Sequence, residues 1–329
     1  MYNEEIKTEY LSSVAETIQK THNSYFNTIS PYEKELRKDI CFFSQKEFQS
    51  MMQNIYRQGS TEKNLYNIIV CLNRYLKWCK EHYSIDSRTS FEIDYSKLVP
   101  FYYKSTEEMI SKVIITMQSK SKEDFPVVEV MNHREAILMN YNIAIGAILL
   151  SWYGLNFEEM MGIENDDILD SEDGIYVKSR KTIIYVEPPI MYRLKNIKYG
   201  KNYLESVRDS DSGENIILEK KFAFTPYFFK KRNPKSNIVS AKTLSAAISD
   251  FNQNSVGTKF SSTFLKENGN FCRAYERAKK LSDLAPKNKS DNEYYNLIFD
   301  DWTKELTPQK FSALKYRYRK FLAFLESEE

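Results

Sequence analysis

The sequence predicts a mostly α-helical chain of two domains with one small β-hairpin or sheet. Its 329 residues exceed what one ordinary core accommodates, which favours two domains. Apolar residues recur at helical spacing in one segment after another, and only nine glycines and nine prolines interrupt them. Residues 174–186 instead alternate between apolar and polar side chains, as a half-buried strand does. With 28% charged and 42% hydrophobic residues, the composition is that of a globular protein.

Net charge and cysteine spacing narrow the functional classes. The net charge of +2 carries no overall polyanion signal, so a nucleic-acid contact would have to come from local clusters. The N-terminal sequence MYNEEIKTEY is acidic and has no apolar run, so it is no signal peptide and we expect a cytoplasmic protein. Four cysteines show no CxxC or Cys/His metal spacing, so we expect buried reduced thiols, no metal and no cofactor: Cys41, Cys71, Cys79 and Cys272.

The N-terminal domain is expected to span residues 1–110 and to be helical. Residues 1–30 predict one helix, and Pro31 is placed in the first turn of the next, where proline is tolerated. Ser44 and Glu47 have the spacing of a capping box, which predicts the start of a further helix.

The clearest amphipathic helix covers residues 61–83. Its apolar residues fall on one face at a period of 3.6: Leu65, Ile68, Ile69, Leu72, Leu76 and Cys79. The opposite face carries one polar stripe: Lys63, Asn67, Arg74 and Lys77. Two interpretations stay open, a solvated helix face or a helix that offers Lys, Asn and Arg to a nucleic-acid groove.

The second domain is expected to span residues 111–329, with the boundary between residues 84 and 124. This stretch is irregular to about residue 103 and then predicts a helix at about 106–119. Its centre is a predicted helix at 137–152 that is apolar on almost every side, as a buried core helix is. That run is shorter than the roughly 18 to 20 residues of a membrane span, so no membrane partner is expected. Gly154 breaks the run, and a short helix is expected at 157–161.

Further elements follow in the second domain. Residues 174–186 predict a β-hairpin or three-stranded sheet, the only good strand signal in the chain. A helix is expected at 192–198, a polar loop at 209–215, and separate helices at 260–265 and 271–284. Pro308 opens a last amphipathic helix. Two alternatives stay open for this helix, packing within its own fold or self-association with a neighbouring protomer.

Basic residues concentrate between positions 220 and 259. Eight Lys or Arg stand there against one acid, Asp250. Ser240, Lys242 and Thr243 fall at a predicted helix N-terminus, which is a natural seat for a phosphate. The stretch therefore predicts a polyanion footprint, with a loop of spare lysines as the alternative. The eight residues are Lys220, Lys221, Lys230, Lys231, Arg232, Lys235, Lys242 and Lys259.

The order of these parts resembles the tyrosine recombinase (phage integrase) family over about residues 30–300. TEKNLYNIIVCLNRYLKWC, from Thr61, looks like the long helix of that family's core-binding domain. ILLSWYGLNFEEMMGI, from Ile148, looks like the segment with its first catalytic arginine, which follows Gly-Leu. SVGTKFSSTFLKENG, from Ser255, matches the frame of its His-x-x-Arg-His box, and residues 178–186 lie where the family has its β-hairpin lysine. The resemblance implies a two-domain clamp, with a helical core-binding domain and a catalytic-type domain.

The departures from the family pattern fall on the residues that carry its chemistry. In that family a tyrosine attacks a DNA phosphodiester, and two arginines stabilise the charge on the phosphate. Here Asn156 takes the first arginine position, Thr258 the second, and Ser255 and Lys259 the histidine positions. Neutral side chains cannot replace the bidentate guanidinium. We therefore expect a protein that is not an enzyme.

The remaining family positions fit this expectation. Tyr294 or Tyr295 lies near the nucleophile position, with Tyr316 and Tyr318 as later options, and we expect these tyrosines to be structural. Lys178 and Lys181 are expected to contact phosphate rather than to catalyse.

By this resemblance the chain is similar to the repressors of SPβ-like prophages, which look like recombinases without catalytic residues. The resemblance implies a sequence-specific transcriptional repressor that maintains lysogeny in the bacterial cytoplasm, at the nucleoid. Its implied partners are double-stranded operator DNA and a phage-encoded antagonist. The expected DNA-binding residues are Lys63, Asn67, Arg74, Lys178, Lys181, Lys230, Lys231, Arg232, Lys242 and Arg273.

Two other functions stay open. A divergent but active site-specific recombinase would need Arg180 or Arg273 in place of the missing pair. A helical interaction protein that binds no nucleic acid would pair the basic stretch with nearby acids: Glu158, Glu159 and Asp166.

Overall fold

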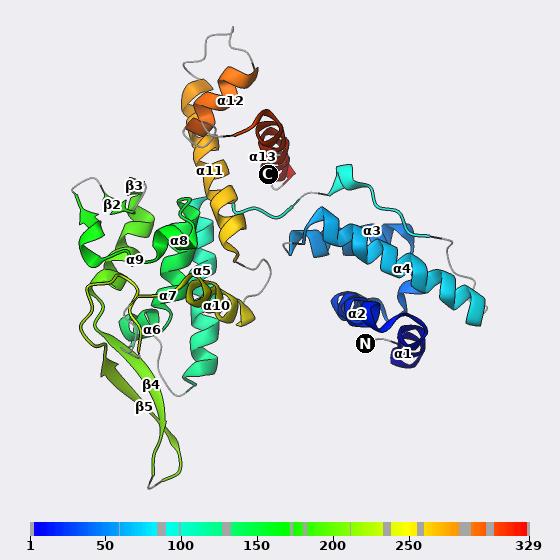
Figure 1. Ribbon diagram of the computed structural model, residues 1–329, viewed down its shortest axis with the longest axis horizontal. Helices are drawn as coiled ribbons and strands as arrows, with labels where there is room; N and C mark the ends of the chain where they lie inside the picture. The colour runs from blue at the N-terminus through cyan, green and yellow to red at the C-terminus, as the bar shows by residue number, and fades with distance from the viewer. Residues whose placement is uncertain are drawn as a thin grey trace. The chain divides into compact units, whose positions relative to one another are not determined.

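The computed structural model describes residues 3–58, 60–83, 90–98, 100–126, 133–171, 174–179, 183–210, 212–232, 238–254, 260–282, 291–300 and 306–327. The chain forms two compact units, Met1–Phe101 with Lys320–Glu329, and Tyr102–Arg319. Helices dominate both units, and two small antiparallel sheets lie in unit 2 (Figure 1). The predicted mostly helical class with a small sheet is confirmed. The boundary placed at residues 110/111 falls inside α5 (Thr106–Asp124).

Unit 1 is built from α1 (Glu4–Ser13), α2 (Glu16–Leu36), α3 (Gln45–Arg57) and α4 (Glu62–Tyr83), with short 3₁₀ turns η1 (Ile40–Phe42) and η2 (Tyr95–Lys97). Its core is aromatic and aliphatic, and it takes the predicted apolar face of α4: Leu65, Ile68, Ile69, Leu72, Leu76 and Cys79 are buried.

Two local predictions in unit 1 have different outcomes. The Ser44–Glu47 capping box is confirmed, because each residue's side chain bonds the other's backbone N–H, at 3.2 and 2.7 Å. The helix start at Pro31 is wrong, because α2 runs through that proline. Proline removes one helical hydrogen bond there, and the buried residues on either side, Ile29 and Glu33, keep the helix against the core.

An ion pair is fully buried in unit 1. Lys7 donates to both carboxylate oxygens of Glu33 at 2.6 Å, and its ammonium lies 3.6 Å from Asp39. Burial raises the pKa of Glu33, and the Lys7 ammonium opposes this shift. The Glu33 carboxylate also accepts from the Ile40 N–H at 2.9 Å, so the pair joins α1 and α2 to η1.

Unit 2 starts with α5, and the remaining elements of the chain follow it. In order they are α6 (Arg134–Asn140), α7 (Asn142–Trp152), α8 (Phe157–Met160), η3 (Asn165–Asp167), β1 (Ile168–Asp170), β2 (Ile175–Lys178), β3 (Ile183–Val186), α9 (Pro188–Tyr199), β4 (Asn202–Arg208), β5 (Asn215–Lys221), α10 (Ala241–Phe251), η4 (Asn252–Asn254), α11 (Ser262–Ser282), α12 (Asp291–Phe299) and α13 (Pro308–Ser327). The last residues of α13 belong to unit 1.

The predicted sheet is confirmed as β1-β2-β3, with both neighbouring pairs antiparallel. Ile175 and Val177 are buried, while Tyr176 and Lys178 point to solvent, as the alternation predicts. Ile175 stands opposite Val186 in the register, so the buried faces of β2 and β3 coincide.

The run predicted as one core helix at 137–152 is buried as expected, but it forms two helices, α6 and α7, on either side of Tyr141. The central helix of unit 2 is α7. All of its residues except Ile143 are buried, and α10 and α11 pack against it. Among the described residues no single helix is long and apolar enough to cross a membrane. The pair α6 and α7 reaches that length and composition only together, across a 76° bend.

One continuous helix, α11, stands where two separate helices were expected. It runs through Gly269, because the glycine is needed for contact rather than for a break. A Cβ at this position would lie 2.0 Å from the carbonyl oxygen of Trp152 in α7. Next to it, the buried Asn268 side chain accepts from Tyr103 N at 2.6 Å and donates to Tyr103 O at 3.0 Å.

A second hairpin, β4–β5, was missed, and the loop expected at 209–215 is largely its turn. The hairpin extends away from the helices of unit 2 (Figure 1). Most of β5 is exposed, so its sequence, NIILEKK, lacks the clean alternation of a half-buried strand.

The last helix, α13, has a buried apolar side within its own chain. Leu314 and Tyr318 are buried, and the Tyr318 ring packs edge-on against Phe271 and Phe299. This is the first of the two alternatives left open for the helix.

We expect Asn268→Ala to destabilise the protein by about 3 kcal/mol, because two hydrogen bonds to buried backbone groups of Tyr103 are lost. The Cys272 thiol, which donates to Tyr103 O at 3.3 Å, does not replace the acceptor for the Tyr103 N–H. Urea unfolding of the variant measures this change. Asn296→Ala, on an exposed position of α12, is the matched control and should stay within about 0.5 kcal/mol of wild type. Equal stabilities for the two variants would contradict this role of Asn268.

Candidate nucleic-acid interface

The polar stripe of α4 lies on an exposed helix face. Lys63, Asn67, Arg74 and Lys77 are all exposed, on the side away from the buried residues of the helix. Lys77 lies 3.9 Å from Glu81 in an exposed pair. Within the described residues, no hydrogen bond or ion pair engages the side chains of Lys63, Asn67 or Arg74. These three side chains are therefore available to a ligand of unit 1.

The basic stretch of unit 2 divides into buried, paired and exposed members. Lys230 is 8% exposed, and its ammonium donates to the carbonyls of Ile197 and Lys198 at the end of α9. Burial lowers the pKa of Lys230 to about 8. The Lys230 ammonium therefore satisfies carbonyl oxygens at the C-terminal end of α9 and is not part of an exposed basic surface. Lys220 forms an ion pair with Glu205 across the hairpin.

The exposed part of the stretch is smaller. Arg232 lies on the surface with its guanidinium 5.4 Å from the ring of Tyr203, and Lys231 donates to Ile238 O at 2.7 Å. Lys242 is exposed in the first turn of α10. Lys235 and Lys259 lie outside the described residues. None of the acids Glu158, Glu159 and Asp166 forms an ion pair with these basic residues in the described part of the chain.

The start of α10 has the predicted cap. Ser240 accepts from the Thr243 N–H at 3.1 Å, and the two hydroxyls lie 2.9 Å apart. The cap satisfies one backbone donor of the first turn, while Lys242 adds a positive charge beside it. The cap is therefore present, and a phosphate at this corner of unit 2 stays a prediction.

Asn156, at the first-arginine position, is the N-cap of α8. Its side chain accepts from Glu159 N at 2.9 Å, and the Glu159 carboxylate accepts from Asn156 N at 2.9 Å. This reciprocal pair is a complete capping box. The asparagine side chain is thus engaged in local structure. The other three substituted positions, Ser255, Thr258 and Lys259, lie outside the described residues, as do Arg180 and Lys181.

A polar network lies beside this turn. The Tyr153 hydroxyl donates to Glu187 Oε2 at 3.3 Å, and Trp152 Nε1 donates to Thr106 Oγ1 at 3.2 Å. Thr106 Oγ1 lies 3.5 Å from Glu187 Oε2 and closes the network. Sequence reasoning missed Glu187 and Thr106, because they come from distant segments and no spacing marks them.

Arg273 belongs to the same region, and it faces inward. Its guanidinium donates to Trp152 O at 3.0 Å and lies 5.1 Å from the ring of Tyr153. It also donates to the side chain of Asn270. Burial lowers the pKa of Arg273, and Tyr153 and Glu187 oppose this shift. Its inward bonds join α11 to the end of α7.

The tyrosines near the nucleophile position differ in exposure. Tyr295 is 6% exposed and packs on Phe299 and Tyr318, whereas Tyr294 is 36% exposed. Burial raises the pKa of Tyr294, and the neighbouring Tyr295 adds a smaller effect in the same direction. Tyr316 is exposed and Tyr318 is buried.

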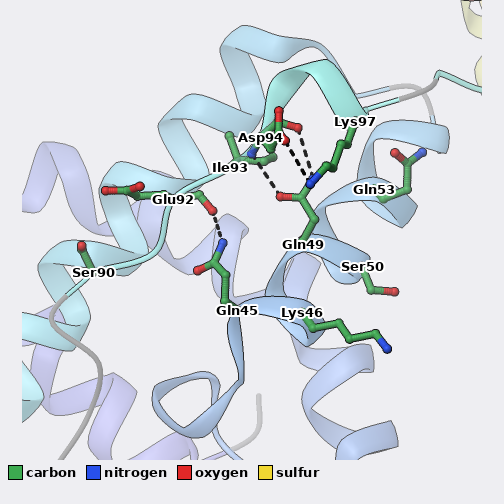
Figure 2. A pocket seen from close by; sticks show the side chains of 10 residues that line it. All are labelled: Gln45, Lys46, Gln49, Ser50, Gln53, Ser90, Glu92, Ile93, Asp94 and Lys97. Carbon is green, nitrogen blue, oxygen red and sulfur yellow. Dashed lines mark hydrogen bonds and ion pairs between the residues drawn. The ribbon is translucent and has the colours of Figure 1, made fainter.

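A groove of about 910 Å³ lies in unit 1 between α3 and residues 90–97 (Figure 2). Gln49 donates to Asp94 O at 3.3 Å and accepts from Asp94 N at 3.1 Å, and Gln45 donates to Glu92 O. Lys97 lies 3.3 Å from the Asp94 carboxylate. The groove is lined by two acids, Glu92 and Asp94, and two lysines, Lys46 and Lys97, so its lining carries no net positive charge for a phosphate chain.

Neither a metal site nor an exposed thiol is found in the described part of the chain. No group of three or more His, Cys, Asp or Glu side chains is placed to hold a metal ion among these residues. All four cysteines are buried, as predicted.

Comparison with known protein families finds a match for the N-terminal part of the chain. Residues 1–81 match the family model described as "MrpR, N-terminal core-binding domain". The resemblance of this part of the chain to a core-binding domain is thereby confirmed. No curated protein in the comparison matches the chain.

Among solved structures, the chain is similar to several recombinases. XerA recombinase is 14% identical with a TM-score of 0.33, over 96% of this chain and 97% of that chain. A dimer of lambda integrase bound to a COC′ core site is 12% identical with a TM-score of 0.31, over 93% and 96%. The integrase from mycobacterium phage Brujita is 11% identical with a TM-score of 0.31, over 96% of each chain.

We expect Asn156→Ala to destabilise the protein by about 1 kcal/mol, because α8 loses its N-cap. Asn156→Asp or Asn156→Ser keeps an accepting oxygen and should cost much less. Thermal unfolding of the three variants side by side measures the difference. If all three lose equal stability, Asn156 has a role other than the cap.

Proposed function

We propose that this protein is a sequence-specific DNA-binding transcriptional repressor of prophage origin, which maintains lysogeny and cuts no DNA. The proposal rests first on the exposed stripe of α4, which lies in the unit that matches a core-binding domain model. Such a repressor works at its operators in the bacterial cytoplasm, on the nucleoid.

The stripe combines the two kinds of contact that a DNA reader needs. Lys63 and Arg74 are cations suited to phosphate oxygens, which set the position of a protein on the duplex. Asn67 lies between them along the helix, and an amide side chain can make a bidentate contact with adenine in the major groove. Their spacing of four and seven residues keeps all three side chains on one line of the helix surface.

Unit 2 supplies further cations. Arg232 and Lys242 are exposed, and Lys178 projects from the solvent face of β2. Lys230 is removed from the predicted set, since its ammonium is bonded to the end of α9. Arg273 is removed for the same reason, because its guanidinium bonds the end of α7.

We propose that the protein does not cleave DNA, and the first reason is the residue at the first-arginine position. Asn156 carries no charge, and its side-chain oxygen already accepts a backbone hydrogen bond. Losing one donor that stabilises a transition-state charge typically costs about 10²–10³ in rate. The same sequence frame puts threonine at the second position, so two such donors would be missing.

The DNA contact can be tested by a gel shift on intergenic fragments of the encoding genome. We expect Lys63→Ala with Arg74→Ala to weaken binding to every fragment and to lower the salt slope by about 2, because two phosphates are no longer neutralised. Asn67→Ala should instead reduce the preference between fragments. Lys80→Ala removes one positive charge from another face of α4 and is the control, to be compared with Lys63→Ala and Arg74→Ala made singly.

In this experiment two results would contradict the assignment. Binding that is insensitive to salt would exclude phosphate contacts, and an equal weakening in Lys80→Ala would exclude a specific α4 face. If the wild-type protein binds none of the fragments, a helical interaction protein becomes the better description.

Cleavage can be tested with nicked suicide substrates made from the bound fragments. We expect no covalent protein–DNA adduct from the wild-type chain, and none from Asn156→Arg, because Ser255 and Thr258 stay unsuited to the chemistry. Denaturing electrophoresis of the reactions detects an adduct. An adduct that disappears with Tyr294→Phe or Tyr295→Phe would establish an active recombinase.

A further inference from the structure

The hydrogen-bond phase of the β4–β5 hairpin determines which backbone groups face outward. Asp209 N donates to Glu214 O and Phe222 N donates to Lys201 O, both at 2.8 Å, so these are bonded pairs of the ladder. Bonded and non-bonded pairs alternate along an antiparallel ladder. With the observed register, four β5 residues therefore direct both N–H and C=O away from β4: Asn215, Ile217, Glu219 and Lys221.

The two outer edges of this hairpin differ at the Leu204–Glu219 pair. On β4 the outward groups of Leu204 are occupied, because the Asn140 side chain accepts from Leu204 N at 2.7 Å and donates to Leu204 O at 2.9 Å. On β5 no strand or side chain bonds the outward groups of Asn215, Ile217 or Glu219 among the described residues. An unpaired strand edge is a template for another strand.

The β5 edge is also apolar. Ile216 is 41% exposed and Leu218 is 38% exposed, and both side chains lie on one face of the hairpin. Val207 stands opposite Ile216 on the same face. A two-stranded ribbon by itself is only marginally stable in water, so this hairpin stands to gain from further strands.

We propose that β5 pairs antiparallel with β5 of a second copy of this chain, about a two-fold axis at Ile217. In this register Ile217 faces Ile217, and Ile216 of each copy faces Leu218 of the other. Asn215 of one copy faces Glu219 of the other, so an amide meets a carboxylate. The two hairpins become one four-stranded sheet with a continuous apolar strip.

Self-complementarity selects both the partner and the register. An axis at Glu219 sets two carboxylates opposite each other, which is unfavourable. An axis at Leu218 puts Ile217 opposite Glu219, and an axis at Ile216 puts Glu214 opposite Leu218. Only the axis at Ile217 matches every apolar side chain with an apolar one.

The pairing closes on itself. A two-fold interface uses the same edge of both copies and leaves none to continue. The remaining edges belong to β4, where Asn140 already bonds Leu204. The sheet is thus expected to stop at a dimer.

A proline scan of the two edges tests the pairing on the full chain without DNA, so its outcome is independent of the proposed function. Ile217 and Ser206 stand opposite each other as a non-bonded pair, so proline at either position removes no hydrogen bond of the hairpin. In sedimentation equilibrium we expect Ile217→Pro to raise the dimer dissociation constant about tenfold to hundredfold, since two hydrogen bonds at the axis cannot form. Ser206→Pro, on the β4 edge, should leave the wild-type dimer unchanged.

A charge pair tests the register without proline. Ile216→Glu and Leu218→Lys should each weaken self-association, and their equimolar mixture should restore a heterodimer, because the new Glu faces the new Lys. No other axis position brings residues 216 and 218 together.

Three results would overturn the proposal. They are a wild-type chain that stays monomeric throughout the micromolar range, a mixture that fails to associate, and an Ile217→Pro variant that dimerises like wild type. Variants that change DNA binding without changing the association state would assign the hairpin to DNA instead.

Discussion

The structure depends on side-chain amides that bond both backbone groups of one residue in another segment. Asn268 does this for Tyr103, deep in unit 2, where an unpaired N–H and C=O would each be costly. The amide presents one donor and one acceptor side by side, so it replaces a strand partner where no strand runs. The same contact recurs in both units, for Asn73 with Phe91, Gln49 with Asp94, Asn140 with Leu204, Asn142 with Lys230, and Asn252 with Phe260.

This contact explains how irregular segments are held against a helical core. Asn268 precedes Gly269, whose missing side chain lets α11 approach the carbonyl of Trp152. Arg273, one turn further along, donates to that same carbonyl. Two residues of one helix, Gly269 and Arg273, therefore fix the end of α7, and with it the turn that carries Asn156. The turn is held firmly although its own residue is neutral, so the scaffold does not require a charged side chain there.

Sequence patterns anticipated what depends on local periodicity. The faces of α4, the alternation of β2, the core helix α7 and the Ser44 cap each follow from neighbours within a few residues. What failed depends on distant partners. Gly269 marks a helix contact instead of a helix end, because Trp152 lies 117 positions away in the chain. The β4–β5 hairpin was not predicted because β5 is mostly exposed. The strand has no buried face that would require apolar and polar residues to alternate.

Burial also determines which lysine and arginine side chains can contact a binding partner. A count of these residues along the sequence does not show which of them are buried. Lys7 and Lys230 have the same side chain as Lys63, yet one is neutralised by Glu33 and the other donates to two helix carbonyls. Taking a charge out of water is costly unless such partners await it. Both lysine side chains are therefore already bonded within the folded protein in the absence of a ligand. The cations that remain available to a polyanion are those with exposed side chains, as on α4. The spacing of these few residues determines what they can recognise.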